Sequence, residues 1–478
     1  MLLSFPMFYP ESYTIACQLF YRLLGFIYFF AFGAFLFQIR GLIGENGILP
    51  LKDHLNFLRK FPLRKRLHYA PTLFWFNSSN TALMSLTTLG VLSSILLMLG
   101  WYPSIQLILL YFLYLSIVGG GQDFLAFGWE GFLLEITIHA YFMSLTIVPC
   151  YLIWASANCL LFRFHFQAGA VKLLSKDPAW TNLTAIAHHY QSQPLPNTIA
   201  WYAHKLPMWF QKGSVLGMFF AEMIAPFGIF WGDFARLTTC AILVLLQYGI
   251  WLTGNFSFLN HLTAVFCIIL INNAVLSNVW EIPVESVEPS LYLVILVNII
   301  GGALLLLQFL RLWNAFFPEI VLEKFFHRIA PLHLANRYGI FAVMTTQRYE
   351  IVIEGSLDGE HWEEYLFRYK PSEISRRPRR ISPYQPRIDW QAWFLPFTEY
   401  EAEPWFKNFL VHLLKGTPDV LALLRKNPFP SAPPRYIRSV IYDYTFTSYE
   451  ERKRNGSWWN RTLIGEYSPA MYLREKHL

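Results

Sequence analysis

Charged residues are scarce in this sequence. Asp, Glu, Lys and Arg make up 14% of the 478 residues, whereas an ordinary soluble chain has about 25%. Apolar residues reach 55% and aromatic residues 18%, a composition typical of a membrane protein. The formal net charge of +7 is not gathered in a basic helix or stripe, so we predict charge at the membrane surface and no nucleic-acid partner.

Cysteines and catalytic motifs are also scarce. The five cysteines lie in apolar stretches and none forms a CxxC pair, which excludes a disulfide framework and a zinc finger. The chain has no HExxH or GxSxG segment and no P-loop, so it is not predicted to be a zinc metalloprotease, a serine hydrolase or a nucleotide-binding protein of that type. We predict neither a metal nor a cofactor.

Long apolar stretches occupy the first two thirds of the chain. Nine of them, each close to the ~20 residues that cross a bilayer, are residues 15–39, 81–99, 103–120, 131–149, 151–171, 213–231, 236–253, 258–276 and 290–312. Charged residues become more frequent after Asn314. We therefore predict a polytopic α-helical membrane bundle of about eight to nine spans in residues 1–314, with interfacial loops that include 172–211, and a C-terminal extramembrane domain in residues 315–478.

The polar tail is predicted to be mostly β. Apolar and polar residues alternate in 349–353 and 365–369, on either side of a Ser-Leu-Asp-Gly turn, which predicts a β-hairpin. A third alternating run covers 435–448. Asp389 is placed to cap a short helix that carries Trp390, Trp393 and Phe394. Together these segments predict a small antiparallel sandwich beside the bundle.

Four arginines of the tail (Arg376, Arg377, Arg379 and Arg380) occupy five positions of a proline-rich segment. Their charges repel one another unless something neutralises them. We therefore predict contact with an acidic surface or with lipid headgroups, and the alternative is a solvated basic loop.

Ionisable residues inside the apolar stretches are costly at bilayer depth and usually face a partner or a cavity. Glu135 and His139 stand four residues apart and share one face of a helix, where the carboxylate would orient the imidazole. Glu222 lies in the middle of another stretch. We favour interhelical hydrogen bonding for these groups, with a catalytic centre as the alternative.

The segment 173–211 is the best candidate for a working surface outside the apolar stretches. It contains His188, His189 and Tyr190 close to a Pro-Leu-Pro turn. Histidines at this spacing lack the other ligands of a metal site, and aromatic residues beside a membrane usually lie at the interface. These residues alone therefore assign no substrate to the segment.

Several irregular segments resemble the lipase maturation factor family. They are GGGQDFLAFGWEGFLLE (119–135), LTAIAHHYQSQPLPNTIAWYAHKLP (183–207), RYEIVIEGSLDGEHWEEYLFRYKP (348–371) and PRIDWQAWF (386–394). The resemblance implies a polytopic membrane protein that secreted lipases need to reach an active, assembled state. Its implied partners are an immature secreted lipase and the lipid bilayer. The implied membrane is the endoplasmic reticulum in a eukaryote or the inner membrane in a bacterium.

Binding roles are expected in and near these segments. The residues concerned are Gln122, Asp123, Trp129, Glu130, His189, Tyr190, Arg376, Arg377, Asp389 and Trp390.

The membrane orientation has two conflicting indications. The basic run RKFPLRKR (59–66) and an odd number of spans would place the tail in the cytoplasm. The resemblance implies a tail facing the lumen or periplasm, and we follow it.

A second likeness concerns FQAGAVKLL (166–174), which is similar to the stretch around the catalytic lysine of vitamin-K-dependent γ-carboxylases. It implies a membrane enzyme with Lys172 as general base on a peptide or lipid-soluble substrate, assisted by Glu135, His139 or His188. The alternative is that Lys172 anchors its span at the headgroups. We expect an assembly factor rather than an enzyme.

Overall fold

A computed structural model describes residues 10–277 and 289–473. Its N-terminal part is helical. The first helices are α1 (Thr14–Leu36), α2 (Ile39–Ile43), α3 (Leu51–Leu58), α4 (Leu63–Tyr69), α5 (Asn80–Met98), α6 (Pro103–Gly120), α7 (Gly128–Ser144) and α8 (Tyr151–Leu174). They are followed by α9 (Pro178–Thr181), α10 (Ala185–Ser192), α11 (Thr198–Ala203), α12 (Met208–Phe219), α13 (Asp233–Thr253), α14 (Leu259–Cys267), α15 (Asn273–Leu276), α16 (Leu291–Phe316) and α17 (Ile320–Ile329).

Within residues 10–277 and 289–473, six helical segments are long and apolar enough to cross a membrane. They are Pro10–Leu36, Asn80–Met98, Pro103–Gly120, Met208–Phe230, Asp233–Thr253 and Leu291–Phe316. These correspond to six of the nine predicted stretches, so the chain is an integral membrane protein with several apolar spans. Of the other three stretches, one forms the 17-residue α7, one forms the shorter α14, and one forms α8, which carries Arg163 and Lys172.

Local sequence features set helix ends and close contacts. At the start of α5 the Ser79 hydroxyl accepts a hydrogen bond from the N–H of Ala82 at 3.3 Å, which satisfies one of the free donors of the first turn. Ser290 caps α16 in the same way. Helices α8 and α16 meet at Gly301, where an added Cβ would lie 2.4 Å from the backbone nitrogen of Ile153. A small residue is required for this approach.

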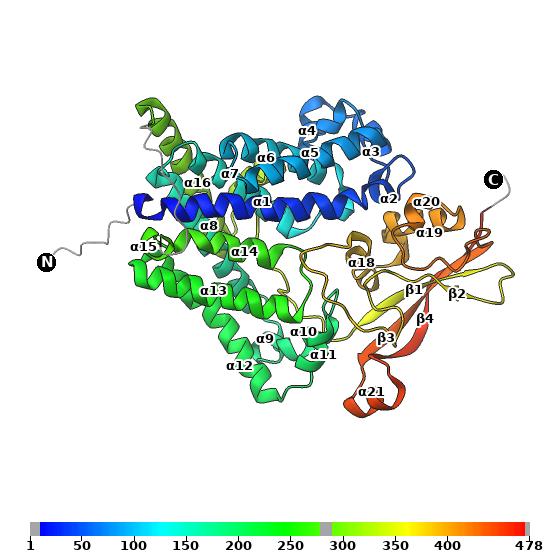
Figure 1. The fold of residues 1–478 in the computed structure, drawn as a ribbon. Helices are drawn as coiled ribbons and strands as arrows, with labels where there is room; N and C mark the ends of the chain where they lie inside the picture. The colour runs from blue at the N-terminus through cyan, green and yellow to red at the C-terminus, as the bar shows by residue number, and fades with distance from the viewer. Residues whose placement is uncertain (1–9, 278–288, 474–478) are drawn as a thin grey trace.

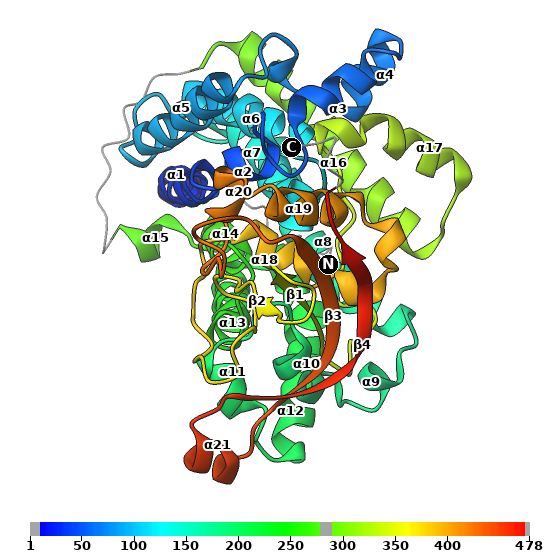
Figure 2. The ribbon, with the colours of Figure 1, turned by 90° about the vertical axis from the view of Figure 1, so that its right-hand side faces the viewer.

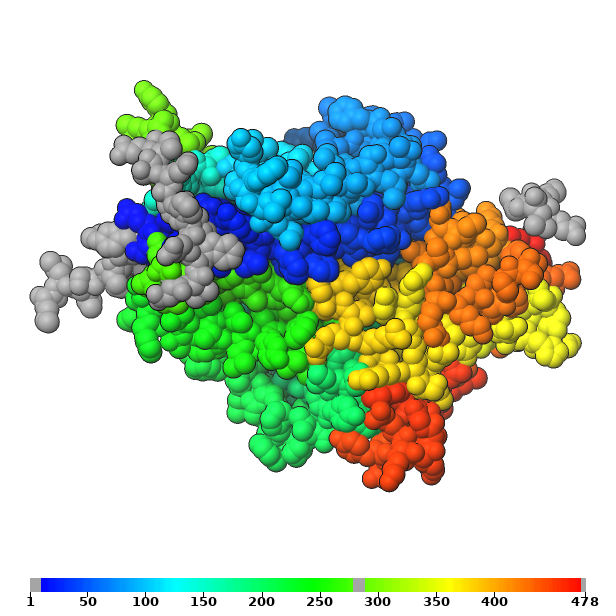
Figure 3. All heavy atoms as spheres, in the orientation of Figure 1, coloured from blue at the N-terminus to red at the C-terminus, as the bar shows by residue number. Residues whose placement is uncertain are grey.

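The two ends of the helical region hold different parts of the chain (Figure 1). At one end, Tyr13 just before α1 donates a hydrogen bond of 2.6 Å to Asp233, the first residue of α13. At the other end, Gln38 just after α1 donates 2.8 Å to the carbonyl oxygen of Gln385 in the C-terminal region. The C-terminal residues therefore lie against one end of the helical region, as the space-filling view also shows (Figure 3).

The C-terminal region combines one sheet with short helices (Figure 2). Its elements are β1 (Tyr349–Ser356), β2 (Glu363–Glu364), α18 (Arg387–Ala392), α19 (Pro404–Leu414), α20 (Pro418–Leu421), β3 (Tyr436–Phe446), α21 (Tyr449–Asn455) and β4 (Trp459–Met471). The four strands form an antiparallel sheet in the order β2-β1-β3-β4. Strand β1 pairs with β3 along its whole length, from Tyr349 opposite Asp443 to Ser356 opposite Tyr436.

This region differs from its sequence prediction at three points. It has a single described sheet instead of a sandwich, and the segment 365–369 is not a strand. After Tyr365, whose N–H still donates to Ile353 of β1 at 2.9 Å, the chain turns away from β1. The backbone N–H groups of Tyr369 and Lys370 then donate to the Asp389 carboxylate at 2.6 and 2.8 Å. Asp389 lies inside α18 and does not cap it, since the helix already begins at Arg387.

Candidate functional site

Three buried carboxylates of the helical region are each paired with a cation. Glu130 and Glu135 belong to α7, and Glu222 lies in a π-helical turn (Phe220–Ile224) after α12. All three are 5% exposed or less. A buried charge without a partner is strongly destabilising. The partners of these carboxylates therefore show which parts of the chain must stay together.

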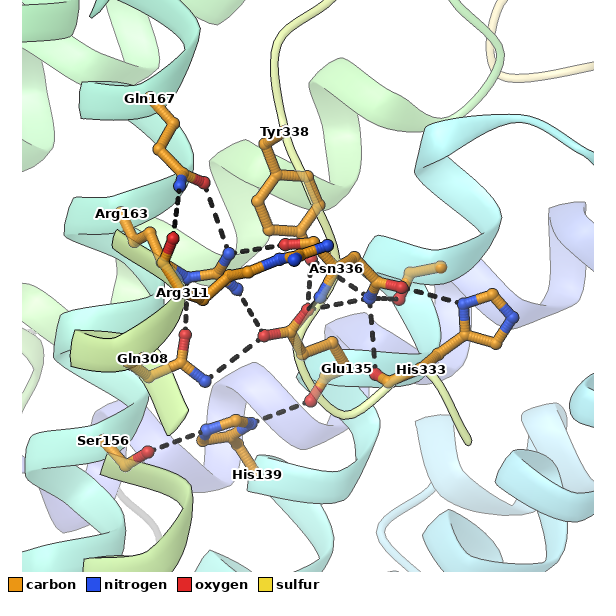
Figure 4. Close-up of polar contacts among 11 residues, drawn as sticks. Glu135, His139, Ser156, Arg163, Gln167, Gln308, Arg311, His333, Asn336 and Tyr338 are labelled. Atoms are coloured by element: carbon orange, nitrogen blue, oxygen red, sulfur yellow. Dashed lines mark hydrogen bonds and ion pairs between the residues drawn. The ribbon is translucent and has the colours of Figure 1, made fainter. Parts of the chain in front are cut away.

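Glu135 connects three helices with the segment that leads into the C-terminal region (Figure 4). Its Oε1 accepts hydrogen bonds from Arg163 of α8 at 2.5 Å and from Gln308 of α16 at 3.2 Å. Its Oε2 accepts from the backbone N–H of Asn336 at 2.8 Å and from the Tyr338 hydroxyl at 2.6 Å. One carboxylate thus fixes the connecting segment in the centre of the bundle.

His139 shares a helix face with Glu135 but does not contact its carboxylate, so that part of the prediction is wrong. The imidazole Nδ1 lies 2.8 Å from the backbone oxygen of Glu135, and Nε2 lies 2.9 Å from the Ser156 hydroxyl of α8. The carboxylate points toward Arg163 instead (Figure 4). His139 consequently links α7 to α8, which is the interhelical role that we favoured.

The Glu130 carboxylate joins α7 to α18. Arg387 Nη1 donates to Glu130 Oε1 at 2.7 Å and to the carbonyl oxygen of Phe124 at 2.9 Å. Both charged side chains are buried. Tyr114 donates to Glu130 Oε2, and Trp129 Nε1 donates to Oε1 at 3.1 Å. The pair is therefore the centre of a buried hydrogen-bonded cluster between the helical and C-terminal regions.

Asp389 and Trp390, two predicted binding residues, are buried at the same junction. The Trp390 ring lies edge-on to Trp129, with ring centres 4.9 Å apart. Burial raises the pKa of Asp389 to about 6, although the backbone N–H groups of Lys370 and Tyr369 favour its charged form. Both residues therefore hold the junction together.

Gln122 and Asp123 lie in the short turn between α6 and α7. They line an open cavity of about 720 Å³ that also contains His54 and His333. Burial raises the pKa of Asp123, and the neighbouring Glu403 carboxylate raises it further. These two predicted binding residues are thus accessible from a surface cavity, whereas Glu130 is fully buried.

Lys172 is buried near the end of α8. Its Nζ lies 2.7 and 2.6 Å from the two carboxylate oxygens of Glu222 and 5.5 Å from the centre of the Trp180 ring. The side chain is only 6% exposed, so the interpretation of Lys172 as a headgroup anchor is wrong. Lys172 and Glu222 thus form a buried ion pair between α8 and the π-helical turn.

The segment 172–211 forms α9, α10 and α11 and leads into α12. Burial, and after it the charge of nearby Lys172, lowers the pKa of His189 to about 4. His188 lies beside His204 instead, since successive helical residues point in different directions. Tyr190 packs in an aromatic cluster with residues of β3 and β4. In the parts of the chain that the structure describes, no group of three His, Cys, Asp or Glu side chains is arranged to hold a metal.

The C-terminal region is hydrogen-bonded to the segment 172–211 through Arg348, which lies just before β1. Arg348 donates to three carbonyl oxygens between Gln191 and Pro194, with distances of 3.0 Å to each of these two residues, and it also pairs with Glu350. Lys370 Nζ lies 2.5 Å from the second Glu350 oxygen. Burial lowers the pKa of Arg348, and the Glu350 carboxylate opposes that shift. The turn at 191–194 is thereby fixed to the sheet.

The arginine-rich segment lies over the C-terminal end of α13. Arg380 donates to the carbonyl oxygen of Leu252 at 3.2 Å, and its guanidinium lies 4.2 Å from the centre of the Trp251 ring. Arg377 donates to the first residue of α11 at 2.9 Å, and Arg376 donates to a carbonyl oxygen of the C-terminal region at 3.4 Å. Helix C-termini carry partial negative charge, so a helix end and a ring take the place of the predicted acidic surface.

Comparison with known proteins covers both regions. A family model described as the lipase maturation factor transmembrane domain matches residues 15–278, and one described as the lipase maturation factor C-terminal domain matches residues 334–469. The chain belongs to the lipase maturation factor family. Lipase maturation factor 1 of Homo sapiens is 33% identical, with 95% of this chain and 87% of that protein covered. Lipase maturation factor 2 of Xenopus laevis is 31% identical, with 95% and 82% covered. No solved structure matches the chain.

The family prediction is thus confirmed, and the two family regions can be used to describe where the paired residues lie. In this lipase maturation factor family member, Glu130 and Glu135 lie in the part that matches the transmembrane domain. Arg387 and Asn336 lie in the part that matches the C-terminal domain. The contacts between these residues hold the two family regions against each other.

Sequence reasoning identified Lys172 but not Arg163 and Arg387, the cations that pair with Glu135 and Glu130. Arg163 lies inside a predicted span, and an arginine at bilayer depth is itself a signal of a buried partner. Arg387 stands beside the predicted Asp389 and Trp390, but nothing in the local pattern connects it with Glu130, which is 257 residues away.

Proposed function

We propose that the chain is a maturation factor for secreted lipases, a membrane-embedded and non-catalytic factor that binds an immature lipase while it folds and assembles. The observation that carries this proposal is the similarity to lipase maturation factors over 95% of the chain. The identities to the two human proteins, 33% for lipase maturation factor 1 and 29% for lipase maturation factor 2, are too close to assign one of the two roles.

The geometry supports a binding role. The Glu130–Arg387 pair and the Arg348 contacts fix the C-terminal region on the end of the bundle. A client held by the C-terminal region and the adjoining loops would stay at a set position relative to the membrane. Arg377, Arg379 and Arg380 are exposed on this surface and offer positive charge to such a client.

We further propose that residues 1–314 form the transmembrane unit, with eight or nine passes, and residues 315–478 the extramembrane unit. Helices α7, α8 and α14 would supply the additional passes. Their polar or short character is tolerated because other helices shield α7 and α8 from lipid. The C-terminal unit would face the endoplasmic reticulum lumen in a eukaryote or the periplasm in a bacterium, where a secreted client is present.

The alternative function is a membrane enzyme with Lys172 as general base. Its support is that the buried Lys172–Glu222 pair lies near His189, whose pKa is lowered, since perturbed titratable groups gather in active sites. The two short contacts between Lys172 and Glu222 oppose it, because they already engage the Lys172 amine in a buried ion pair. We therefore favour a structural role for this pair.

Co-expression of a secreted lipase with the chain tests both functions. The variants are Lys172→Met, which leaves the Glu222 charge buried and unpaired, and the double variant Lys172→Met/Glu222→Gln, which leaves no charge. If the pair is structural, the single variant loses part of its effect on lipase activity and the double variant recovers it. The mass of the secreted lipase should be the same with and without the chain.

Complete loss in both variants at normal membrane levels, or an added mass on the client, would establish the enzyme instead. A wild-type chain that has no effect on lipase activity, compared with empty membranes, would overturn the maturation role.

A further inference from the structure

A mostly apolar cavity of about 290 Å³ lies where the C-terminal ends of α8 and α16 face the segment 337–340. This volume is close to the lower end for ligand pockets. The apolar side chains of its wall include Phe164, Ala168, Val171, Leu174, Phe316 and Ile340. Leu174 and Ile340 are about half exposed, so the cavity opens at the molecular surface.

The cavity holds a buried cation that the contacts above leave unbalanced. Arg311 of α16 is 9% exposed, and its Nε and Nη1 have no hydrogen-bond partner among the residues that the structure describes. The guanidinium lies over the Phe326 ring, 4.4 Å from its centre. It also lies beside Arg163, whose charge Glu135 already balances (Figure 4). An anion at this position would satisfy donors that are otherwise buried without partners.

A second cation stands at the mouth of the cavity. The Arg337 side chain is 71% exposed, and its nearest carboxylate oxygen belongs to Glu323 at 3.8 Å. Glu323 also accepts a hydrogen bond from Asn314 at 2.7 Å. Arg311 and Arg337 therefore share one nearby carboxylate, which leaves an excess of positive charge at the entrance.

Helix α17 places this entrance at the depth of the lipid headgroups. It follows directly after α16, a segment long and apolar enough to cross the membrane, and lies beside it in Figure 2. Ile320 and Val321 are 70% and 72% exposed, whereas Phe326 is buried against the bundle. A short amphipathic helix with exposed apolar residues at the end of a span lies in the membrane surface.

We propose that this cavity binds an anionic amphiphile from the bilayer, with its phosphate or carboxylate on Arg311 and Arg337 and its acyl chain along the apolar wall. The guanidinium fork matches both oxyanions, since it donates parallel hydrogen bonds to two oxygens. A phospholipid and a free fatty acid both present this chemistry. The site uses none of the exposed arginines proposed for client binding (Arg377, Arg379 and Arg380), so it can be tested separately from the maturation function.

Photo-crosslinking of the full chain in nanodiscs tests the site. The probes are diazirine-bearing phosphatidylglycerol, diazirine-bearing palmitic acid and, as an uncharged control, diazirine-bearing diacylglycerol. Labelled peptides are mapped by mass spectrometry. The variants are Arg311→Gln, which removes the buried charge, and Ala168→Phe, which fills the cavity and keeps both arginines. Arg328→Gln is the matched control, because it removes an exposed cation of α17 outside the cavity lining.

We expect one of the anionic probes to label peptides from 164–174 and 311–317 saturably, and the better probe identifies the source of the ligand. Labelling should fall by about tenfold or more in Arg311→Gln, as for the loss of a charged hydrogen bond, and similarly in Ala168→Phe. Arg328→Gln should label like the wild type. Equal labelling by diacylglycerol, or unchanged labelling in both cavity variants, would overturn the proposal and indicate ordinary annular lipid.

Discussion

The Glu130–Arg387 pair can be broken from the C-terminal side by Arg387→Met, which keeps an apolar chain of similar length. The Glu130 carboxylate would then remain buried with Tyr114 and Trp129 as its donors but without a counter-charge. Removing one partner of a buried pair costs about 3–5 kcal/mol. Because the pair lies between α7 and α18, we expect this energy to be lost from the docking of the C-terminal region.

Hydrogen exchange measured by mass spectrometry in detergent reports that docking directly. Peptides covering α18 should exchange roughly a hundredfold faster or more in Arg387→Met, since each tenfold corresponds to about 1.4 kcal/mol. Peptides covering α5, which is remote from the pair, serve as the internal control. The double variant Glu130→Gln/Arg387→Met leaves no buried charge, so its α18 peptides should exchange more slowly than those of the single variant.

A double-mutant cycle completes this test. A coupling energy of about 2 kcal/mol or more between the two positions is expected for residues in direct contact. If Arg387→Met leaves α18 exchange unchanged, or if the effects of the two substitutions simply add, the pair does not hold the two regions together and the reasoning is refuted.

Three further perturbations follow from described contacts. Burial raises the pKa of Asp389 to about 6, so its contribution to stability is present at low pH and is lost as the pH rises through 6. Thermal unfolding should therefore show higher stability at pH 5 than at pH 7.5, by at most roughly 3 kcal/mol. The substitution Asp389→Asn should remove this difference. Arg348→Gln should free the turn at 191–194, and limited proteolysis should cut there at least several times faster than in the wild type. Gly301→Val should destabilise the chain by about 1–3 kcal/mol, because a Cβ would lie 2.4 Å from the Ile153 backbone nitrogen; an unchanged melting temperature would contradict the close packing of α8 and α16.

Hydropathy and the alternation of apolar and polar residues predicted those helices and strands whose local sequence pattern alone indicates burial. The long apolar segments of α1, α5, α6, α13 and α16 were predicted within a few residues, because lipid selects apolar side chains around the whole helix. Strands β1 and β3 were predicted from the alternation of apolar and polar residues in their sequences, although the structure buries all of β1 after Tyr349. Strand β4 was not predicted, since residues Leu463 and Ile464 are both exposed and its pattern of burial does not alternate.

The sequence predicted several charged residues of the candidate site but not the residues with which they pair. Glu135, Glu222 and Lys172 stand out because charges are rare in apolar stretches. Their counter-charges depend on contacts between distant segments, as with Glu222 and Lys172 at a separation of 50 residues. The same limit applies at short range. The prediction placed His188 with Lys172, but the structure places His189 there, because a step of one residue along a helix decides which side chain faces inward.

The separation of 257 residues between Glu130 and Arg387 also constrains biosynthesis. Chains are synthesised at about 5–20 residues per second, so Glu130 emerges roughly 13–50 s before the arginine that neutralises it. During that interval helix α7 must be retained by the insertion machinery, or carry a proton on Glu130, or stay in contact with water. The helical region therefore cannot reach its final packing while the nascent chain is incomplete, and a premature stop before residue 387 would leave a membrane domain with a permanently unpaired charge. Quality control of this protein is thus expected to depend on whether its last third has been made.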